Sequence, residues 1–584
     1  MSARPPSGPS PVVRTVVAAA GSIAAITLVA RVVGFGRWFA FSHSVGATCV
    51  GSVYQSVNAV PNVIFEIAAG GVLAAVVVPL VAGALARDNR RAADDTASAL
   101  LTWALLVLLP LGALVLLAAR PIAATLLGTG CSGEADLGAE FLVIFSAQLP
   151  LYGIAIVLGG ILQAHRRFVA AALAPLISSV VVIATYLSYR GLVPDPAAPI
   201  SAIPTQGVLV LAVGTTLGVA AMALTLALPL RSARLRLRPR LGFPVGAGRR
   251  VRSLAVAGLL AVAGQQLATL VVIRLANDRG GVGTLNVFTY AQAVMLLPYA
   301  VLAVPLATAA FPSLARAVAR VETGARGGSH IGRQAVQDTP GRGGDADAVR
   351  EADTTLRHSW FAVLAVGIAG AGLLVAVAGP VGAFFRLLDA GGGTDASART
   401  LATMSQALAA FAPSVPALGA IALLSRACYL REKAVLAGAV VGLAWLATTV
   451  PALAVLEPGA TDGPRTLWVL ALGSSVGLGG GAVALAVLVR REWGRSVLSV
   501  PWRPLLAILT GALVAALAGW SVGSRAQSDH LLGALGAGTA IGAGAILVMG
   551  LVALAVDPTL PRRLRGLRAS AAPEARTTTG GGAA

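Results

Sequence analysis

Two arginines lie six residues apart near the end of the first long apolar segment, in the stretch ARVVGFGRW at residues 30–38. An arginine in hydrocarbon costs about 2.5 kcal/mol or much more, so Arg31 and Arg37 need a partner or a function there. Guanidinium groups match phosphate oxygens and keep their charge. On a helix, six residues correspond to about 120° of rotation and about 9 Å of rise. We therefore expect the pair to contact a large anionic headgroup at two levels.

Further polar side chains interrupt the apolar segments. Asn58, Asn62 and Glu66 recur every four residues and would share one helix face. Two later segments carry Gln265, Gln266 and Arg274, and Asn286 and Gln292. Polar groups at membrane depth usually face a bundle interior or a water-filled cavity. If these segments line one cavity, its three arginines outnumber its one glutamate, which favours an anionic lipid headgroup over a cationic drug.

Each of these residues also has a simpler interpretation. Arg37 and Arg274 could extend to a membrane interface, and Asn58 and Asn62 could join neighbouring helices by hydrogen bonds. Glu66 could pair with an arginine and so lower the free-energy cost of burying it, and Gln292 could be a packing residue. The sequence leaves these alternatives open.

The composition identifies the class of protein. Of the 584 residues, 57% are hydrophobic and 12% are charged, against roughly 25% charged in soluble proteins. The mean hydropathy is +0.82, which indicates an integral membrane protein. The net charge of +20 lies in short arginine-rich segments between apolar ones. That pattern follows the positive-inside rule, so we expect a lipid bilayer and no nucleic acid as a partner.

The sequence predicts an all-α fold of fourteen membrane spans, since a span needs about 20 apolar residues. They are 16–42, 50–86, 96–119, 138–163, 168–189, 206–230, 251–276, 285–315, 358–385, 400–425, 433–455, 466–489, 503–523 and 531–555. Segment 50–86 exceeds one crossing and contains Pro61, Gly70, Gly71 and Pro79, which suit a kinked helix.

The connecting loops alternate in charge. Every second loop is rich in arginine, as in RDNRR at 87–91 and RREWGR at 490–495, and the others hold most of the loop aspartates. This alternation predicts a plasma-membrane protein with both termini in the cytoplasm. Cys49 and Cys131 then both lie near the outer face, where a disulfide is geometrically allowed. The three cysteines match no zinc or redox motif.

An internal repeat divides the chain. Residues 71–87 resemble 304–320, and 148–167 resemble 411–431. Parallel repeats are a known plan of transporters, with the substrate site between the halves. We predict two six-helix bundles at 15–230 and 251–490, a basic loop at 231–250 and two further helices within 491–555. We expect a disordered N-terminus at 1–14, a flexible cytoplasmic loop at 321–353 and a basic tail at 556–584.

Catalytic motifs are absent from the sequence. The chain has no Walker A motif, no HExxH, no GxSxG and no clustered cysteines and histidines. We expect a transporter rather than an enzyme, with no cofactor, driven by a membrane potential or an ion gradient.

A family resemblance rests on three stretches: ARVVGFGR at 30–37, AVPN at 59–62 and GGVLAAVVVPL at 70–80. Together with residues 288–317, they resemble the MurJ or MviN lipid II flippase family in its actinobacterial form, within the multidrug/oligosaccharidyl-lipid/polysaccharide exporter superfamily. The resemblance covers roughly residues 15–555. It implies export of undecaprenyl-diphosphate-linked disaccharide-pentapeptide by alternating access for peptidoglycan synthesis, with cell-wall synthesis proteins as candidate partners.

The resemblance also implies a cavity whose arginines hold the diphosphate, and Arg31 and Arg37 match two of those positions. Elsewhere the chain departs from the family's pattern. Ser52 aligns with a position that is acidic in the family. Phe65 or Glu66 aligns with one of the family's cavity arginines, and Ala293, beside Gln292, aligns with another. Arg274 is a candidate to compensate. Two alternatives therefore remain, a flippase for another polyprenyl-linked glycan and a multidrug/cation antiporter that would use Glu66. A non-transporting membrane scaffold is the third.

Overall fold

The structure is a computed structural model of the full chain. It describes residues 11–70, 89–165, 167–232, 237–242, 249–308, 342–389, 395–525 and 528–559, together with single positions and short stretches within 77–85 and 311–318. All regular structure in these ranges is helical, which confirms the predicted all-α fold.

The first half of the chain forms one group of helices. They are α1 (Pro11–Ser44), α2 (Cys49–Phe65), the π-helical turn η1 (Glu66–Gly70), α4 (Arg90–Leu117), α5 (Ala119–Leu126), α6 (Glu134–Phe145), α7 (Gln148–Ala164), α8 (Phe168–Leu192), η2 (Ile200–Ala202) and α9 (Thr205–Ser232). Within this group α8 packs between α1 and α9, and α7 packs on α4 and α9.

The second half forms a corresponding group. It contains α10 (Arg249–Leu275), η3 (Ala276–Gly280), α11 (Thr284–Pro298), η4 (Tyr299–Ala303), α13 (Arg342–Ala376), α14 (Ala378–Leu388), α15 (Asp395–Ala402), α16 (Met404–Phe411), α17 (Ser414–Leu430), α18 (Ala434–Ala447), α19 (Val450–Val455), α20 (Gly463–Trp493) and η5 (Arg495–Leu498). Here α10 packs on α18, and α17 packs on α13 and α20.

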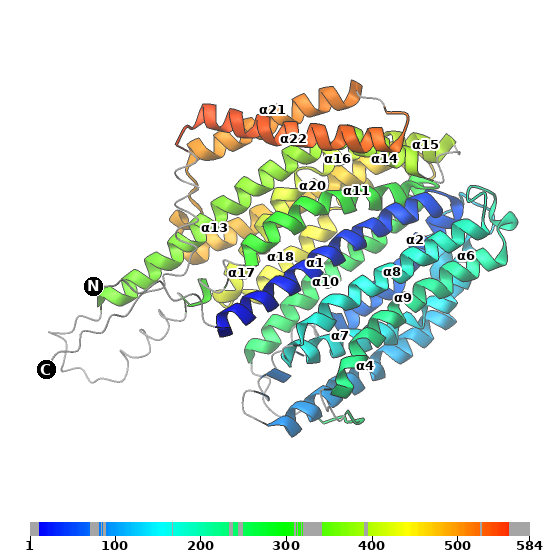
Figure 1. The fold of residues 1–584 in the computed structure, drawn as a ribbon, viewed down its shortest axis with the longest axis horizontal. Coiled ribbons are helices and arrows are strands. Elements are labelled where there is room, and N and C mark those ends of the chain that lie inside the picture. Colours follow the sequence, from blue (N-terminus) through cyan, green and yellow to red (C-terminus); the bar gives the residue numbers. More distant parts are fainter. Residues whose placement is uncertain are drawn as a thin grey trace.

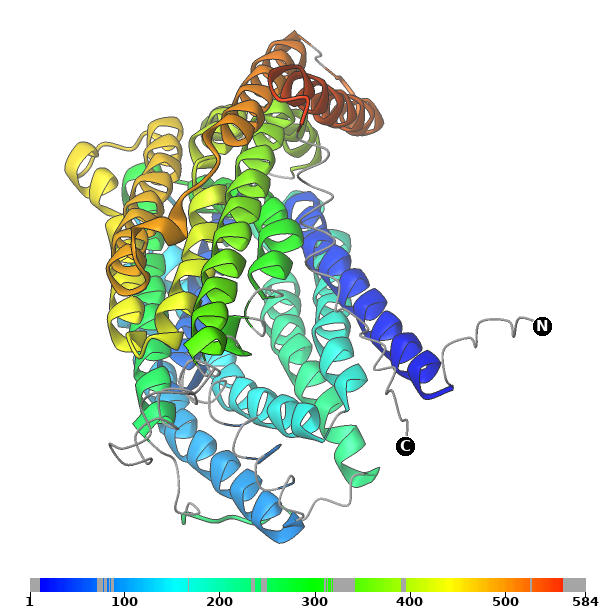
Figure 2. The same cartoon turned by 90° about the vertical axis from the view of Figure 1, so that its left-hand side faces the viewer.

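Two further helices complete the described chain. Helices α21 (Trp502–Arg525) and α22 (Leu531–Val556) pack on each other and on α13 and α14. They lie along one edge of the bundle in Figures 1 and 2. This arrangement matches the predicted two helices after the second bundle.

The bundle has two ends, which we name by their turns. The cysteine end carries the turns at 45–48, 127–133 and 281–283, and the arginine end carries the turns at His165, at 431–433 and at Gly494. Helix α1 ends, and helices α2 and α11 begin, at the cysteine end.

The predicted spans agree with the helices. Twelve helical stretches among the described residues are long and apolar enough to cross a membrane, and each overlaps one of the last twelve predicted spans. The first predicted span, 16–42, lies within α1, and the second, 50–86, overlaps α2 and η1 over residues 50–70. Gly71 and Pro79, predicted to kink the second span, lie outside the described residues.

Two helices begin inside segments that the sequence predicts to be unstructured. Helix α1 already begins at Pro11, inside the segment 1–14, since proline is tolerated in the first turn of a helix. Helix α13 begins at Arg342, inside the predicted loop 321–353, because DADAVREA at 345–352 is rich in helix-forming alanine, arginine and glutamate. Residues 1–10, 319–341 and 560–584 lie outside the described part.

The basic loop between the halves is partly described. Its residues 237–242 lie alongside helix α4. The backbone N–H of Arg238 donates a hydrogen bond to Ser98 Oγ, and the backbone N–H of Arg240 donates one to Thr102 Oγ1. The Arg240 guanidinium pairs with Asp95, and the Trp103 indole donates to the carbonyl of Leu241. The chain that joins the two halves is thus attached to the first half.

The internal repeat is visible in the backbone. The π-helical turns η1 and η4 begin 233 residues apart, at Glu66 and Tyr299, and each continues an α-helix whose last turns contain a proline, Pro61 or Pro298. A π-helical turn widens a helix locally and is frequent at functional sites. Because α2 and α11 also pack on each other, the two equivalent helices lie together between the halves.

Candidate functional site

Helix α2 carries a row of polar side chains. Its N-terminus is fixed by Thr48, whose hydroxyl accepts a 3.0 Å hydrogen bond from the N–H of Gly51. Asn58 and Glu66 are half-buried and Asn62 is exposed, so all three side chains are accessible on the predicted face of the helix. Glu66 stands where α2 widens into the π-helical turn.

A cavity of about 130 Å³ lies between the two halves of the chain. Its lining comes from α2, α10, α11, α20 and the C-terminal end of α18. The polar side chains around it are Gln55, Thr269, Thr289, Gln292, Thr448 and Ser474. This central cavity therefore offers uncharged hydrogen-bonding groups, which suit hydroxyl and amide groups of a ligand.

Gln292 was expected in the site, and the structure places it on the central cavity. Gln55 was missed, although it precedes Asn58 by three residues and so shares its helix face. Because both glutamines line the same cavity, the equivalent helices α2 and α11 each contribute one amide to it.

The two arginines of α1 lie in different surroundings. Arg37 is half-buried, its guanidinium carbon lies 5.7 Å from the centre of the Trp38 ring, and it lies in the neighbourhood of Tyr152 and Tyr186. Arg31 is exposed, next to the exposed Val32. Arg37 thus faces α7 and α8 inside the first half, and Arg31 is accessible closer to the arginine end.

Arg274 lies apart from the two arginines of α1. It stands at the end of α10, where it donates 2.7 Å to the carbonyl of Leu127 and pairs with Asp278 at 3.1 Å. This position fits the alternative in which Arg274 extends toward an interface, because its partners belong to the cysteine end. Its hydrogen bond also joins the second half of the chain to the first.

Other hydrogen bonds join the halves at the same end. The N–H of Gly283 donates to Ser52 Oγ at 2.8 Å, and Asn286 Nδ2 donates to the carbonyl of Gly46 at 2.7 Å. Asn277 Nδ2 donates to Ser56 Oγ at 2.8 Å. All three links are buried.

A buried carboxylate adds to this seam. Asp389, directly after α14, accepts hydrogen bonds from Ser42 Oγ at 2.7 Å and from the N–H of Ala47 at 2.8 Å. Beside it, the rings of Tyr290 and Phe385 stack at 5.0 Å between centres. We call the hydrogen bonds of Asp389, Ser52, Ser56, Asn286 and Arg274 the polar seam. It closes the cysteine end of the bundle above the central cavity.

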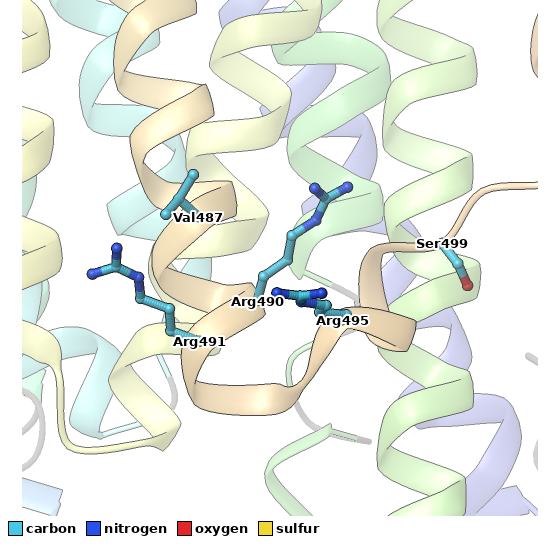
Figure 3. A pocket seen from close by; sticks show the side chains of 5 residues that line it. All are labelled: Val487, Arg490, Arg491, Arg495 and Ser499. Carbon is cyan, nitrogen blue, oxygen red and sulfur yellow. The ribbon is translucent and has the colours of Figure 1, made fainter.

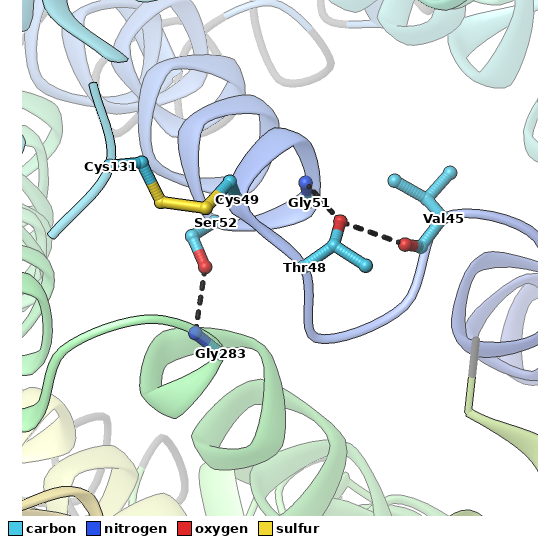
Figure 4. Close-up of a disulfide and its surroundings, with 7 residues drawn as sticks. All are labelled: Val45, Thr48, Cys49, Gly51, Ser52, Cys131 and Gly283. Atoms are coloured by element: carbon cyan, nitrogen blue, oxygen red, sulfur yellow. Dashed lines mark hydrogen bonds between the residues drawn. A yellow bond between two sulfur atoms is a disulfide. The ribbon is translucent and has the colours of Figure 1, made fainter. Parts of the chain in front are cut away.

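The two cysteines predicted near one face form a disulfide. Cys49 and Cys131 are bonded with their Cα atoms 6.1 Å apart, as Figure 4 shows. The bond links the first residue of α2 to the turn before α6. Because Ser52 follows one turn later on α2, the disulfide fixes the helix end that contributes to the polar seam.

The described residues contain no group of three or more histidine, cysteine, aspartate or glutamate side chains that could hold a metal ion. The site consists instead of a polar row on α2, an uncharged cavity between equivalent helices and a closed seam at one end. This arrangement suits a protein that binds a ligand with one end of the bundle open and releases it with the other end open.

Comparison with known proteins identifies the family. The family model described as "Lipid II flippase MurJ" matches residues 41–540. The chain belongs to the MurJ family. A curated relative, the lipid II flippase MurJ of Burkholderia cenocepacia, is 25% identical over 301 residues, which are 51% of this chain and 56% of the relative. The chain therefore matches little more than half the length of that relative.

Solved structures share the fold. A lipid II flippase MurJ in an inward closed conformation has a TM-score of 0.66 at 17% identity, covering 93% of this chain and 99% of the other. An inward-facing multidrug resistance MATE family transporter of the MOP superfamily has a TM-score of 0.56 at 15% identity, covering 79% and 94%. A MOP superfamily transporter from Pyrococcus furiosus reaches 0.52 at 15% identity, covering 80% and 96%.

Within this MurJ-family chain, the sequence indicated only part of the polar seam. Asn286 and Arg274 were among the expected polar residues, whereas Asp389 and Ser56 were not, and the contact of Ser52 with the other half was not predicted. Asp389 occurs in LLDAGGGTD, which reads as an ordinary polar loop. The hydroxyl of Ser52 accepts a hydrogen bond from the backbone N–H of Gly283 in the other half. Neither contact has a signal in local sequence, since each joins residues more than 200 positions apart.

Proposed function

We propose that this protein is a flippase that moves lipid II, the polyprenyl-diphosphate-linked peptidoglycan precursor, from the inner to the outer leaflet of the plasma membrane. The observation that carries the proposal is the central cavity between the equivalent helices α2 and α11, in a chain that belongs to the MurJ family. The activity is that of a transporter without catalytic chemistry, so no bond of the substrate is broken.

The proposed orientation places the arginine end in the cytoplasm. The arginine-rich loops support this orientation through the positive-inside rule, with both termini on the cytoplasmic side. The polar seam and the disulfide then lie at the outer face. The described conformation, closed at the seam, corresponds to one that receives substrate from the cytoplasmic leaflet.

Substrate contacts follow from charge and exposure. Arg31 and Arg37 bind the diphosphate, because guanidinium groups give paired hydrogen bonds to phosphate oxygens. Asn58, Asn62 and the central cavity, with Gln55 and Gln292, bind hydroxyl and amide groups of the glycan and peptide. Glu66, half-buried in the same row, adds a carboxylate to this surface. Arg274 acts in the polar seam, so its contribution is to close the outer end.

Alternating access requires the polar seam to break. Every bond of the seam joins two elements that must separate for the outer end to open, and bistable interfaces of this kind convert small shifts into domain motion. A membrane potential or an ion gradient supplies the free energy, since the chain has no nucleotide-binding motif.

Reconstitution tests the proposed substrate. The full chain is placed in liposomes with labelled lipid II, or with a different polyprenyl-linked glycan, and translocation of each is scored. We expect transport of lipid II to exceed that of the other glycan by at least tenfold. Preferential transport of the other glycan would assign the chain to that substrate, equal transport would contradict selectivity for lipid II, and transport of neither would overturn the flippase proposal.

A second candidate function has one observation in its favour. The fold resembles a multidrug resistance MATE family transporter, and half-buried Glu66 offers a carboxylate that an antiporter of cationic drugs would use. Glu66→Gln separates the two: an antiporter would lose dye efflux completely, whereas a flippase would retain most lipid II transport. Wild-type efflux of cationic dyes that disappears in this variant would favour the antiporter.

A further inference from the structure

A second cavity lies away from the proposed transport path, at the arginine end of α20. It measures about 540 Å³ and is lined by Val487, Arg490, Arg491, Arg495 and Ser499. Three of its five lining residues are arginines and none is acidic. Figure 3 shows these side chains around the end of α20 and the start of η5.

The backbone brings the third arginine to the first two. Arg490 and Arg491 are in the last turn of α20, and Gly494 follows with a φ of 97°. This is the left-handed region, which glycine adopts without a steric cost. The chain therefore turns sharply, and Arg495 at the start of η5 lines the same cavity as Arg490.

Neighbouring cations are paired, whereas these three are not. Lys433 pairs with Glu492 at 3.4 Å, and Arg431 lies over the ring of Trp493 at 4.2 Å. Among the described residues, Arg490, Arg491 and Arg495 form no ion pair, hydrogen bond or ring contact of their side chains. The positive-inside rule explains why arginines lie at this end, but it does not require three unpaired ones around one cavity.

An apolar stripe leads along α20 to this cavity. Val476, Val483 and Val487 are 55%, 65% and 45% exposed and are spaced seven and four residues apart. At 100° per residue they share one helix face to within about 40°, and Arg490 and Arg491 flank that same line. The face therefore continues from exposed valines to a pair of guanidinium groups.

The residues that follow this cavity along the chain are of the types found at a membrane interface. Trp502, 66% exposed, follows it at the start of α21, with Arg503 over its ring at 5.4 Å. Exposed tryptophan next to arginine is typical of the headgroup region of a bilayer. Basic pockets at the cytoplasmic side of membrane helices bind anionic lipid headgroups.

We propose that this cavity binds the phosphate-bearing headgroup of an anionic phospholipid, whose acyl chain lies along Val476, Val483 and Val487. The orientation of the site toward the inner leaflet rests on the proposed function, but the binding itself does not. The ligand is a bilayer component at a site separate from the central cavity.

Native mass spectrometry of the purified full chain tests the proposal. Phosphatidylglycerol is titrated against phosphatidylcholine, with inorganic phosphate as a separate arm. A guanidinium group in direct contact with the bound headgroup should contribute about fivefold in affinity, so R490Q/R491Q/R495Q should weaken phosphatidylglycerol binding by about a hundredfold. The matched control R90Q/R91Q/R238Q removes three exposed arginines of the same end and should change binding by less than about threefold.

A second variant addresses the acyl chain. Val483→Asn places a polar group on the stripe without changing charge, and it should weaken phosphatidylglycerol binding several-fold. Helix content by circular dichroism confirms that each variant is folded. Equal weakening by both triple variants, no preference of the wild type for phosphatidylglycerol, or full competition by inorganic phosphate would overturn the proposal. Loss of lipid II transport with retained selective binding would count against the proposed function alone.

Discussion

Ser42 in α1 donates a 2.7 Å hydrogen bond to Asp389, which lies 347 residues later at the end of α14. The same carboxylate accepts from the N–H of Ala47, so one side chain holds the end of the first span and the turn that follows it. The contact joins the two halves of the chain at the end where α2 and α11 begin. Opening of that end has to break it.

Asp389→Ala should favour the conformation that is open at the outer end. The substitution leaves two buried donors without an acceptor, and hydrogen bonds to a charged group are worth about 1.5–3 kcal/mol. We expect a shift of the conformational equilibrium by about tenfold or more. Labelling of a cysteine introduced by Gln55→Cys in the central cavity, with a membrane-impermeant maleimide, measures the shift.

The control for this experiment is Asp395→Ala, which removes an exposed carboxylate at the start of α15 near the same end. Its labelling rate should match that of the parent chain. If Asp389→Ala labels no faster than Asp395→Ala, the contact with Ser42 does not hold the outer end closed.

The disulfide between Cys49 and Cys131 should contribute to stability. It closes a loop with a sequence separation of 82 residues, for which chain entropy gives about 4 kcal/mol. C49S/C131S should therefore lower the thermal midpoint of the detergent-solubilised protein, and reduction of the wild type should do the same. Cys428 is buried and free, so its alkylation on heating reports unfolding in both forms.

A matched comparison distinguishes the effect of breaking the disulfide from the effect of replacing a cysteine side chain. C428S removes a cysteine that forms no disulfide and should leave the effect of reduction unchanged. Reduction that lowers the midpoint of C49S/C131S as much as that of the wild type would contradict a stabilising role of the bond.

Much of the fold follows from the sequence because apolar length and loop charge are local properties. The last twelve predicted spans each overlap a candidate span. The second predicted span contains a π-helical turn at Glu66, and the kink expected in that span stays a prediction. The helical start of α13 at Arg342 was not predicted, because the helix-forming residues after Gly344 directly follow a polar, glycine-rich stretch.

The site was less predictable, for a physical reason. Asn58, Asn62 and Glu66 could be placed on one face because four-residue spacing is sufficient for that. Arg274 could not be placed, because its partners, Leu127 and Asp278, depend on how α5 and η3 meet in space. A long side chain at a helix end reaches in several directions, and only the tertiary fold selects one.

Arg37 and Arg31 should differ in their contributions to transport. Arg37 is half-buried beside Trp38, whereas Arg31 is exposed, so Arg37 is the better-oriented ligand for a diphosphate. We expect Arg37→Ala to abolish complementation of a flippase-depleted strain and Arg31→Ala to reduce lipid II transport strongly. Arg37→Lys should restore only part of the activity, because lysine keeps the charge but lacks the planar fork.

The readouts are growth of the depleted strain and transport in liposomes, with membrane insertion checked by immunoblotting. Arg190→Ala serves as the control, since that residue lies in the last turn of α8 at the cysteine end and donates to the carbonyl of Pro194. Full activity of both Arg31→Ala and Arg37→Ala would exclude the proposed binding of the diphosphate by α1.

Close packing of α10 on α18 should be sensitive to a single methyl group. A Cβ at Gly264 would lie 2.4 Å from both the Cα and the carbonyl oxygen of Gly442, so the two backbones would have to separate. Overpacking of this kind costs about 1–3 kcal/mol. Because Thr269 and Trp445 on the same helices line the central cavity, Gly264→Ala should lower both thermal stability and lipid II transport.

Gly480→Ala is the matched control for this last prediction. Gly480 lies inside α20, and a Cβ there would meet nothing within 4 Å. Alanine exceeds glycine in helix propensity by about 1 kcal/mol, so this variant should be as stable as the wild type or more stable. The thermal midpoints of both variants are measured in detergent. If Gly264→Ala and Gly480→Ala unfold at the same temperature, α10 and α18 do not contact each other through their glycines, and this contact does not position the wall of the central cavity.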